Sequence, residues 1–498
     1  MTRLDKVLVA NRGEIALRVM RACREAGIAT VAVYSRPDRA ARHVRYADEA
    51  CEIGPAPAGE SYLRPDRIVE AALSAGARAV HPGYGFLAEN PRLPRACAEA
   101  GLVFIGPSPE VMERVGDKTR ARRLAAEAGV PVIPGMSEPI SDPGEAARAA
   151  AEAGYPVLLK AAGGGGGKGM RVVSSPEELA EAYRRAASEA QAAFHNSDIY
   201  LEKFIDRPRH VEFQILADSR GGAVHLNERE CSVQRRYQKL VEEAPSPAVD
   251  DSLRAEMGEA ALRVARTVGY TSAGTVEFLL APSGEFYFCE MNARLQVEHP
   301  LTELVTGVDI VREQLRIAAG EALSLRQEEI RSRGWAIECR IYAEDPDTFL
   351  PSTGRILDMV EPSGPGVRLE SGVGEGEEIS MHYDPMVAKL LAWGRDRPEA
   401  VARLRRALGE YVVTGIKTAI PTLLRVLDDP RFLSGKYDTS LIANLGPAPA
   451  GDDIEAAALA AAVFVAASRR VSLGGAGEGM KRWRLAGRAN EGIRRRDW

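Results

Sequence analysis

The chain has 498 residues, a length that predicts several domains rather than one core. Its apolar fraction of 45% and charged fraction of 27% are ordinary for a globular protein, and its net charge of -5 argues against a nucleic-acid binder. Six scattered cysteines, no signal-peptide pattern and no apolar run of membrane-spanning length predict a soluble cytoplasmic protein with neither a zinc site nor disulfides.

The first part of the chain has the pattern of a parallel α/β domain. A strand at Lys6–Ala10, a helix over Ile15–Ala26 and a strand at Thr30–Tyr34 predict a βαβ unit, and further units follow up to about Gly116. The turn after the first strand is not GxGxxG, so a dinucleotide fingerprint is absent. The loop His81–Phe86 follows the carboxyl end of a strand, where open α/β sheets bind ligands.

A glycine-rich loop marks the next part of the chain. Gly163–Gly167 lies between strands predicted at Pro156–Lys160 and Met170–Val173, which favours a hairpin loop over a linker. Such a loop lets backbone amides approach phosphates. It is not a Walker loop, because Ala162 stands where the first glycine belongs and Gly169 replaces Ser or Thr.

A densely charged run follows at Asn227–Glu243. Such a run is usually a solvated face, and we expect this of most of its residues. Gln234 and Lys239 gain a functional interpretation only from the segment that comes next.

That segment is a predicted hairpin of Gly274–Leu280 with the strand that begins at Phe286. Polar residues then recur at every second position: Glu290, Asn292, Arg294, Gln296 and Glu298. In an extended backbone they would line one face. A symmetric two- or four-residue loop would place Glu277 opposite Glu290, a like-charge pair that a hard cation would neutralise, with Asn292 next on that face. The alternative is an edge hairpin with chance alignment, because a three-residue loop would separate the two carboxylates.

These stretches together resemble the biotin carboxylases of the ATP-grasp superfamily, from about Asp5 to about Leu445. The matching motifs are ANRGEIALR, HPGYGFLAEN, GDK, KAAGGGGGKGMRVV, RPRHVE, ERECSVQRR, QKLVEEAP, GTVEF, EMNARLQVEHP, AIECRIYAEDP and YDPMVAKL. The resemblance implies a mixed α/β and α+β multidomain fold. Its expected parts are a Rossmann-like domain at 1–116, an ATP-grasp domain at 117–333 with a mobile lid at about 132–205, a C-terminal biotin carboxylase domain at 334–446 and a variable helical tail at 447–498.

The resemblance also implies a two-step ligase reaction. Bicarbonate attacks the γ-phosphate of Mg-ATP to give carboxyphosphate, and the CO2 passes to N1′ of biotin. Such chemistry depends on positioning and charge neutralisation. By family position, Mg²⁺ or Mn²⁺ is held by Glu277, Glu290 and Asn292. The residues implied for ATP are Lys118, Lys160, Gly164, Gly165, Gly166, Glu202, Lys203, Ile205, His210, Gln234 and Tyr237.

The implied catalytic residues are Lys239, Arg294, Glu298 and Arg340. Bicarbonate would lie between Lys239, Arg294 and the backbone near Gln296 and Val297, and Glu298 would accept its proton. The alternative for Arg294 and Glu298 is a structural salt bridge. Arg340 would stabilise the enolate-like oxygen of biotin, and Tyr84 would lie near the biotin pocket. The family usually has His where Tyr237 stands, so we expect a modest change in nucleotide affinity.

The sequence lacks a Met-Lys-Met biotinylation site, since Met480-Lys481-Arg482 does not match, and no carboxyltransferase region fits. We therefore expect biotin on a separate carrier protein, a partner carboxyltransferase subunit, and, from the family, a homodimer. In the tail, Asp452 or Asp453 can cap a helix through Ser468, either a peripheral helix or a docking element. The acceptor stays open between acetyl-CoA, propionyl-CoA, another acyl-CoA, pyruvate and a 2-oxo acid.

Two other function classes compete with this one. Another ATP-grasp ligase, which activates a substrate carboxylate as an acyl phosphate, would use the metal hairpin and the glycine loop equally well. RLQVEHP and the arginine of IECR favour bicarbonate and biotin instead. A catalytically silent scaffolding homologue is disfavoured by the presence of Lys239, Arg294, Glu298 and Arg340.

Overall fold

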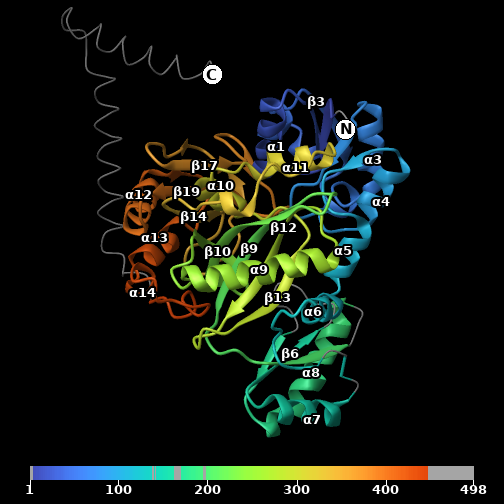
Figure 1. The fold of residues 1–498 in the computed structure, drawn as a ribbon. Helices are drawn as coiled ribbons and strands as arrows, with labels where there is room; N and C mark the ends of the chain where they lie inside the picture. The colour runs from blue at the N-terminus through green and yellow to red at the C-terminus, as the bar shows by residue number, and fades with distance from the viewer. Residues whose placement is uncertain (1–3, 137–138, 141, 162–169, 195–197, 447–498) are drawn as a thin grey trace, which may run out of the picture. The chain divides into compact units, whose positions relative to one another are not determined.

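A parallel sheet with helices on both faces forms the N-terminal part of the computed structural model, which describes residues 4–136, 139–140, 142–161, 170–194 and 198–446 (Figure 1). The strand order is β3-β2-β1-β4-β5. The strands are β1 Lys6–Val9, β2 Ala29–Ser35, β3 Glu49–Gly54, β4 Ala79–His81 and β5 Val103–Phe104. The helices are α1 Gly13–Glu25, α2 Arg42–Tyr46, α3 Pro65–Ser74, α4 Arg92–Glu99 and α5 Pro109–Gly116, with 3-10 turns η1 Arg36–Asp38 and η2 Ala58–Glu60.

Alternation along β1 explains the two covered faces. Val7 and Val9 pack with α1, whereas Leu8, between them, packs with residues of α3 and α4. A strand buried on both sides reads as an unbroken apolar run, as the sequence indicated. The Rossmann-like expectation for this part of the chain is confirmed.

A small antiparallel sheet follows, in the order β7-β6-β8. Its strands are β6 Val157–Ala161, β7 Met170–Val173 and β8 Ile199–Lys203, and the helices of this region are α6 Lys118–Glu127, α7 Pro143–Ala153 and α8 Pro176–Phe194. Residues 162–169 connect two strands that pair antiparallel, with Lys160 opposite Met170, so the predicted hairpin is confirmed. The loop itself, with Gly164, Gly165 and Gly166, lies outside the described residues.

An eight-stranded sheet in the order β13-β12-β9-β10-β11-β14-β19-β17 forms the centre of the chain. Its strands are β9 Arg209–Ala217, β10 Ala223–Arg235, β11 Gln238–Ala244, β12 Ser272–Leu280, β13 Phe286–Asn292, β14 Trp335–Tyr342, β17 Val367–Ser371 and β19 Met386–Gly394. Because β11 pairs with β14, the boundary expected near residue 333 falls within one continuous sheet. The compact unit extends from Met1 to Leu445.

The remaining elements surround this sheet. They are α9 Asp251–Val268, α10 His299–Thr306, α11 Ile310–Ala318, α12 Arg397–Glu410, α13 Ile420–Asp428, α14 Pro430–Leu433 and η3 Gln327–Glu329, with two short pairs, β15 Gly354–Arg355 with β18 Glu378–Ile379 and β16 Met359–Val360 with β20 Val412–Val413. Among the described residues, no helix is long and apolar enough to cross a membrane.

The two faces of the central sheet differ in chemistry. On β9 and β12, Val211, Phe213 and Val276 pack into the apolar cluster that contains α9. The residues between them, Glu212 and Glu277, are opposite one another across the two strands and carry buried carboxylates. Alternation with a period of two therefore gives one face to the core and the other to polar chemistry.

The hairpin of β12 and β13 confirms the predicted pairing by a different route. Glu277 lies opposite Glu290, but the loop between Leu280 and Phe286 has an odd length, and a bulge next to Cys289 restores the register. The prediction of a symmetric two- or four-residue loop was wrong. A bulge adds one unpaired residue to one strand, so it compensates for the extra loop residue.

Two further expectations were wrong. The extended face ends at Asn292, because the N–H of Ala293 donates to Glu89 at 3.1 Å instead of continuing the ladder, and helix α10 begins at His299. The charged run is also less solvated than expected. Arg236 is exposed, but residues 228–234 are buried, because β10 lies inside the sheet between β9 and β11.

Candidate functional site

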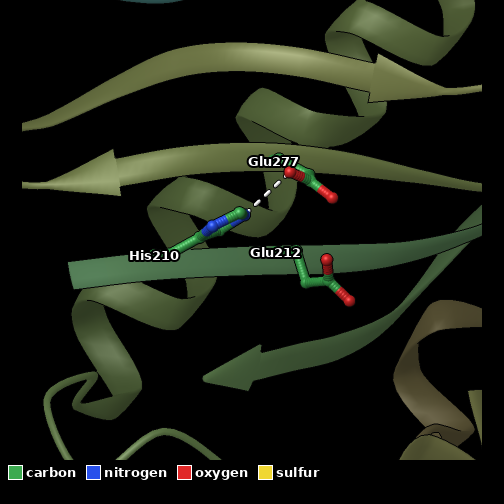
Figure 2. Close-up of side chains that lie close together, drawn as sticks. All are labelled: His210, Glu212 and Glu277. Carbon is green, nitrogen blue, oxygen red and sulfur yellow. Dashed lines mark ion pairs between the residues drawn. The ribbon is translucent and has the colours of Figure 1, made fainter. Parts of the chain in front are cut away.

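Glu277 is the centre of the polar face. Its carboxylate lies 2.7 Å from Nε2 of His210 and 3.1 Å from Nζ of Lys239, and it accepts hydrogen bonds from the side-chain amides of Asn292 at 2.9 Å and Gln296 at 3.3 Å. Figure 2 shows His210 and Glu212 on one strand and Glu277 on its neighbour, with His210 directed toward Glu277. Burial opposes ionisation, but Lys239 and His210 outweigh it and hold the pKa of Glu277 well below its usual range.

Lys239 lies among three carboxylates. Its Nζ is 2.6 Å from Glu212, 2.6 Å from Glu298 and 3.1 Å from Glu277. Burial favours the neutral amine, yet the surrounding acidic groups raise the pKa of Lys239 well above its ordinary value. The ammonium is therefore permanent and joins strands β9, β11 and β12 to the segment before α10.

Glu298 is held between two cations. It accepts from Lys239 at 2.6 Å and from Arg340 at 3.0 Å, and its side chain is fully buried. Burial alone would raise its pKa, but Lys239 and Arg340 outweigh that effect and lower the pKa of Glu298 well below the usual value. On its other side, Arg340 donates to Glu242 at 2.6 Å, and burial raises the pKa of Glu242 to about 7.

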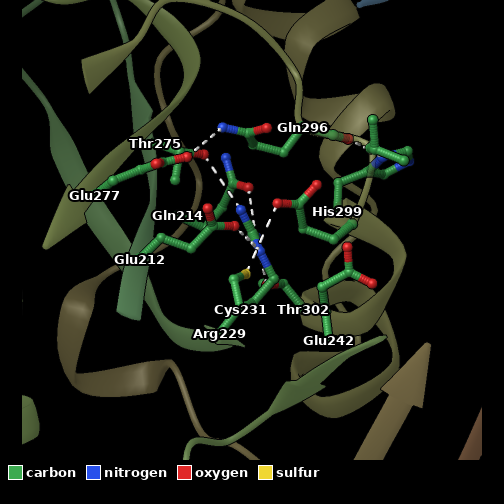
Figure 3. A network of polar contacts seen from close by, with 12 residues as sticks. Glu212, Gln214, Arg229, Cys231, Glu242, Thr275, Glu277, Gln296, His299 and Thr302 are labelled. Carbon is green, nitrogen blue, oxygen red and sulfur yellow. Dashed lines mark hydrogen bonds and ion pairs between the residues drawn. The ribbon is translucent and has the colours of Figure 1, made fainter. Parts of the chain in front are cut away.

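A fully buried arginine, Arg229, bonds to the side chains next to Lys239 and Glu298. Arg229 donates to Glu212 at 2.6 Å, to Gln214 at 2.8 Å and to Thr302 of α10 at 2.9 Å. Figure 3 shows these side chains converging with those of Glu277 and Gln296. A guanidinium that is bonded on several sides fixes the positions of its partners. Arg229 therefore sets the position of Glu212, which in turn contacts Lys239.

Arg294 reaches the same region from the segment after β13. It donates to Glu89 at 2.9 Å, to Gln296 at 2.7 Å and to Asn292 at 3.2 Å. Although burial opposes its charge, Glu89 raises its pKa, and Glu298 and Glu277 add to that effect. The predicted polar residues thus converge although the strand has ended, because Glu89 fixes the chain where it turns.

Tyr84 lies on the N-terminal side of the site. Its hydroxyl donates to Glu14, and its main-chain carbonyl accepts from Asn11 at 2.7 Å. Burial and Glu14 raise the pKa of Tyr84 well above its usual value, while Arg340 acts in the opposite direction. The phenol of Tyr84 therefore stays protonated, and Arg340 is close enough for the two groups to interact electrostatically.

The residues expected to bind a nucleotide fall into two groups. One group is on the small sheet, where Lys160 of β6 pairs with Glu202 of β8 and Lys203 donates to the carbonyls of Gly154 at 2.7 Å and Tyr155 at 2.9 Å. The half-buried Ile205 follows β8. The other group belongs to the large sheet and its surroundings: His210, Gln234, Tyr237 and Lys118, which is 3.4 Å from Glu290. Tyr237 is 54% exposed in the β10–β11 turn.

The donor set suits a hard cation. Glu277 and Glu290 are cross-strand neighbours, Asn292 bonds to Glu277, and all three carry oxygen donors of the kind that Mg²⁺ and Mn²⁺ prefer. In addition, ligand atoms of His210, Glu212 and Glu277 lie within 4.8 Å of one another. Protein cations already compensate Glu277, so an incoming metal would displace or share those contacts.

Sequence reasoning missed several residues of this site. Glu212 follows His210 by two positions in an alternating strand, a signal that was present. Glu89 lies inside the HPGYGFLAEN stretch, and Arg229 was hidden in a run expected to be solvated. Alternation alone would put Glu242 on the face opposite Lys239, and only the shift in register between β10 and β11 near Leu240 changes this. All six cysteines are free, as expected.

Family models match three consecutive parts of the chain. "Biotin carboxylase, N-terminal domain" matches residues 3–112, "Carbamoyl-phosphate synthase L chain, ATP binding domain" matches 117–326, and "Biotin carboxylase C-terminal domain" matches 338–444. The second match covers the small sheet and strands β9–β13 of the eight-stranded sheet, and the third match begins within β14 of that same sheet.

One relative and two solved structures resemble almost the whole chain. A biotin carboxylase of Nostoc sp. is 52% identical over 441 residues, which is 88% of this chain and 99% of that protein. The biotin carboxylase domain dimer of Hydrogenobacter thermophilus 2-oxoglutarate carboxylase, solved with MgADP, ADP and bicarbonate, has 50% identity and a TM-score of 0.86 and covers 89% of this chain and 98% of that one. The crystal structure of the biotin carboxylase subunit of pyruvate carboxylase has 49% identity and a TM-score of 0.77, over 89% of this chain and 98% of that one.

Proposed function

This chain belongs to the biotin carboxylase family, and on that premise we propose that it catalyses the ATP-dependent carboxylation of biotin by bicarbonate, a ligase reaction that forms a C–N bond. The observation that carries the proposal is Glu298, a buried carboxylate held between Lys239 and Arg340 beside the Glu277 hairpin. One carboxylate is thereby placed between a cation for bicarbonate and a cation for biotin. Another ATP-grasp ligase would have no need of the second cation.

In the first step, Glu298 accepts the proton of bicarbonate. An oxygen of bicarbonate bonds to the γ-phosphorus, and the bond from that phosphorus to the bridging oxygen of ADP breaks. Lys239, Arg294 and the backbone near Gln296 and Val297 orient the anion. Because the pKa of Glu298 lies well below its usual range, the carboxylate is ionised at neutral pH and free to accept a proton, although Lys239 and Arg340 weaken its basicity.

In the second step, the bond between the carboxyl carbon and the phosphate oxygen of carboxyphosphate breaks to give CO2 and phosphate. The phosphate accepts the proton of N1′, and N1′ of biotin then bonds to the carbon of CO2. Arg340 stabilises the enolate-like oxygen that develops on the biotin ring, since a preformed cation acts best where charge develops. Glu242 holds Arg340 from the opposite side at 2.6 Å, so the guanidinium is positioned before biotin arrives. Tyr84 lies close enough to Arg340 to interact with it electrostatically, on the biotin side of the site.

ATP is bound between the small sheet and the large one. We assign this role to Lys118, Lys160, the loop with Gly164, Gly165 and Gly166, Glu202, Lys203, Ile205, His210, Gln234 and Tyr237. Glu277, Glu290 and Asn292 would hold Mg²⁺ or Mn²⁺, which neutralises phosphate charge when bound. The opposed carboxylates of Glu277 and Glu290 support that role.

The chain acts within a larger carboxylase. We infer two partners, a biotin carrier protein and a carboxyltransferase subunit, together with a homodimer of this chain; relatives that are named as a subunit or as a domain dimer support this. The family matches support the division at 1–116, 117–333 and 334–446. Six free cysteines suit a reducing cytoplasm. The relatives belong to carboxylases of different acceptors, so we infer that a partner sets the acceptor.

ADP release from the full chain with Mg-ATP tests the proposal. We expect release to require both bicarbonate and free biotin, with carboxybiotin formed in equal amount. ADP release that ignores biotin would favour another ligase, and no release under conditions where ATP binds would favour a silent homologue.

A further inference from the structure

A fully buried lysine lies behind the active site. Lys389 of β19 is 0% exposed and lies opposite Arg340 of β14 in the sheet register. Its Nζ donates to the main-chain carbonyl of Val297 at 2.7 Å and lies 3.3 Å from Glu14. A buried ammonium is costly unless it is paired, and a well-packed neutral side chain would avoid that cost. The cation therefore invites a functional explanation.

Its contact with Val297 fixes a peptide that borders the proposed bicarbonate site. The preceding carbonyl, of Gln296, is bonded by Nδ1 of His299 at 2.7 Å. A carbonyl only accepts, so Nδ1 carries the proton, and burial lowers the pKa of His299 and keeps the ring neutral. In a trans peptide the N–H points opposite to the C=O. With both carbonyls fixed, the N–H groups of Val297 and Glu298 are fixed in the opposite direction.

The same lysine is tied to the proposed biotin side. Glu14, in the first turn of α1, is shared by Lys389 and the hydroxyl of Tyr84, and Nζ of Lys389 is 5.7 Å from the centre of the Tyr84 ring. Glu338 and Glu370 are the further acidic groups whose charge is coupled to Lys389. A chain of contacts thus runs from the Val297 carbonyl through Lys389 and Glu14 to Tyr84.

We propose that Lys389 is a positioning residue that aims the backbone amides at Val297 and Glu298 toward bicarbonate and, through Glu14, holds Tyr84 in a fixed place relative to them. This inference rests on the proposed function, because it assigns bicarbonate to the 296–298 segment. Lys389 itself touches neither substrate. Its effect is carried by a main-chain carbonyl and by one shared carboxylate.

The experiment compares Lys389→Met with the double variant Lys389→Met/Glu14→Gln in the full chain. The single change leaves Glu14 buried without its ammonium, whereas the double change removes the ion pair as a unit and protects folding. Arg397→Met is the matched control, because Arg397 also pairs with a buried carboxylate, Glu243 at 2.7 Å, and the other bonds and ring contacts of its side chain within the described residues go to Leu433, Phe432 and Tyr437.

We expect the double variant to raise the KM for bicarbonate about tenfold or more, because it loses one charge-assisted hydrogen bond that fixes the peptide. The KM for ATP should stay within about twofold of wild type. Glu14→Gln alone should raise the KM for free biotin more than that for bicarbonate. Thermal shifts give a second readout: bicarbonate added with MgADP should raise the unfolding midpoint of wild type and Arg397→Met, and much less that of the double variant.

The outcomes separate the two proposals. If wild type shows no ADP release dependent on bicarbonate and biotin, the proposed function fails. If wild type shows it but the double variant loses only stability or kcat, with an unchanged KM for bicarbonate and an unchanged bicarbonate thermal shift, Lys389 is a structural ion-pair residue and the positioning proposal is overturned.

Discussion

Glu298→Gln isolates the proposed base, because glutamine keeps the size of the side chain and removes its charge and basicity. General-base catalysis contributes about 10²–10⁴-fold to a rate, and we expect kcat for biotin-dependent ADP release to fall within that range. The loss does not depend on assay pH near neutrality, because the pKa of Glu298 lies well below its usual value and the wild-type group is ionised throughout.

The structure also sets the cost to folding. After the change, Lys239 keeps Glu212 at 2.6 Å and Glu277 at 3.1 Å, and Arg340 keeps Glu242 at 2.6 Å, so neither cation is left unpaired. Removal of one of several crowded carboxylates offsets part of the lost hydrogen bonding. We expect a net cost of about 1 kcal/mol, a shift of about 2 °C in the unfolding midpoint.

Glu242→Gln is the matched control for this prediction. It is the same exchange at a buried carboxylate that also bonds Arg340, whereas Glu298 bonds Lys239 as well. ADP and carboxybiotin should be measured together at saturating Mg-ATP and bicarbonate, and we expect Glu242→Gln to lose less than about tenfold. The reasoning is refuted if Glu298→Gln stays within about threefold of wild type, or if both variants lose equally, which would assign the effect to the position of Arg340.

Three other predictions concern stability and metal binding. Glu242 has a folded pKa of about 7, above its unfolded value, so its stabilising contribution of up to about 3 kcal/mol is present below about pH 4.5 and is lost as the pH rises to about 7. Between pH 5.5 and pH 8.0 the unfolding midpoint should therefore decline less for Glu242→Gln than for wild type, and an equal decline would contradict this. Arg229→Met removes a fully buried guanidinium and leaves Glu212 with one fewer cation, so we expect a loss of about 3–5 kcal/mol in chemical denaturation, whereas a loss below about 1 kcal/mol would mean that Arg229 is dispensable. Glu277→Gln should raise the Mg²⁺ concentration for half-maximal ADP release at least about tenfold, and an unchanged requirement would remove Glu277 from the metal site.

Local pattern determined a large part of this protein. The sequence predicts a hairpin of Gly274–Leu280 with the strand that begins at Phe286, and in the structure this hairpin places Glu277 opposite Glu290 as predicted. The existence of the two strands and the direction of their side chains can be read from a few consecutive residues, whereas the loop length that was assumed for the register was wrong.

The tertiary structure alone decided how distant segments complete the site. Glu89 ends β13 at Asn292 and holds Arg294, and Lys389 reaches the Val297 carbonyl from another strand of the sheet. The bulge near Cys289 decides the register of the hairpin, and no residue pattern in the sequence predicted this bulge. The physical reason is that a periodic pattern specifies which face a side chain occupies, whereas its partner across a long sequence separation depends on how whole elements pack.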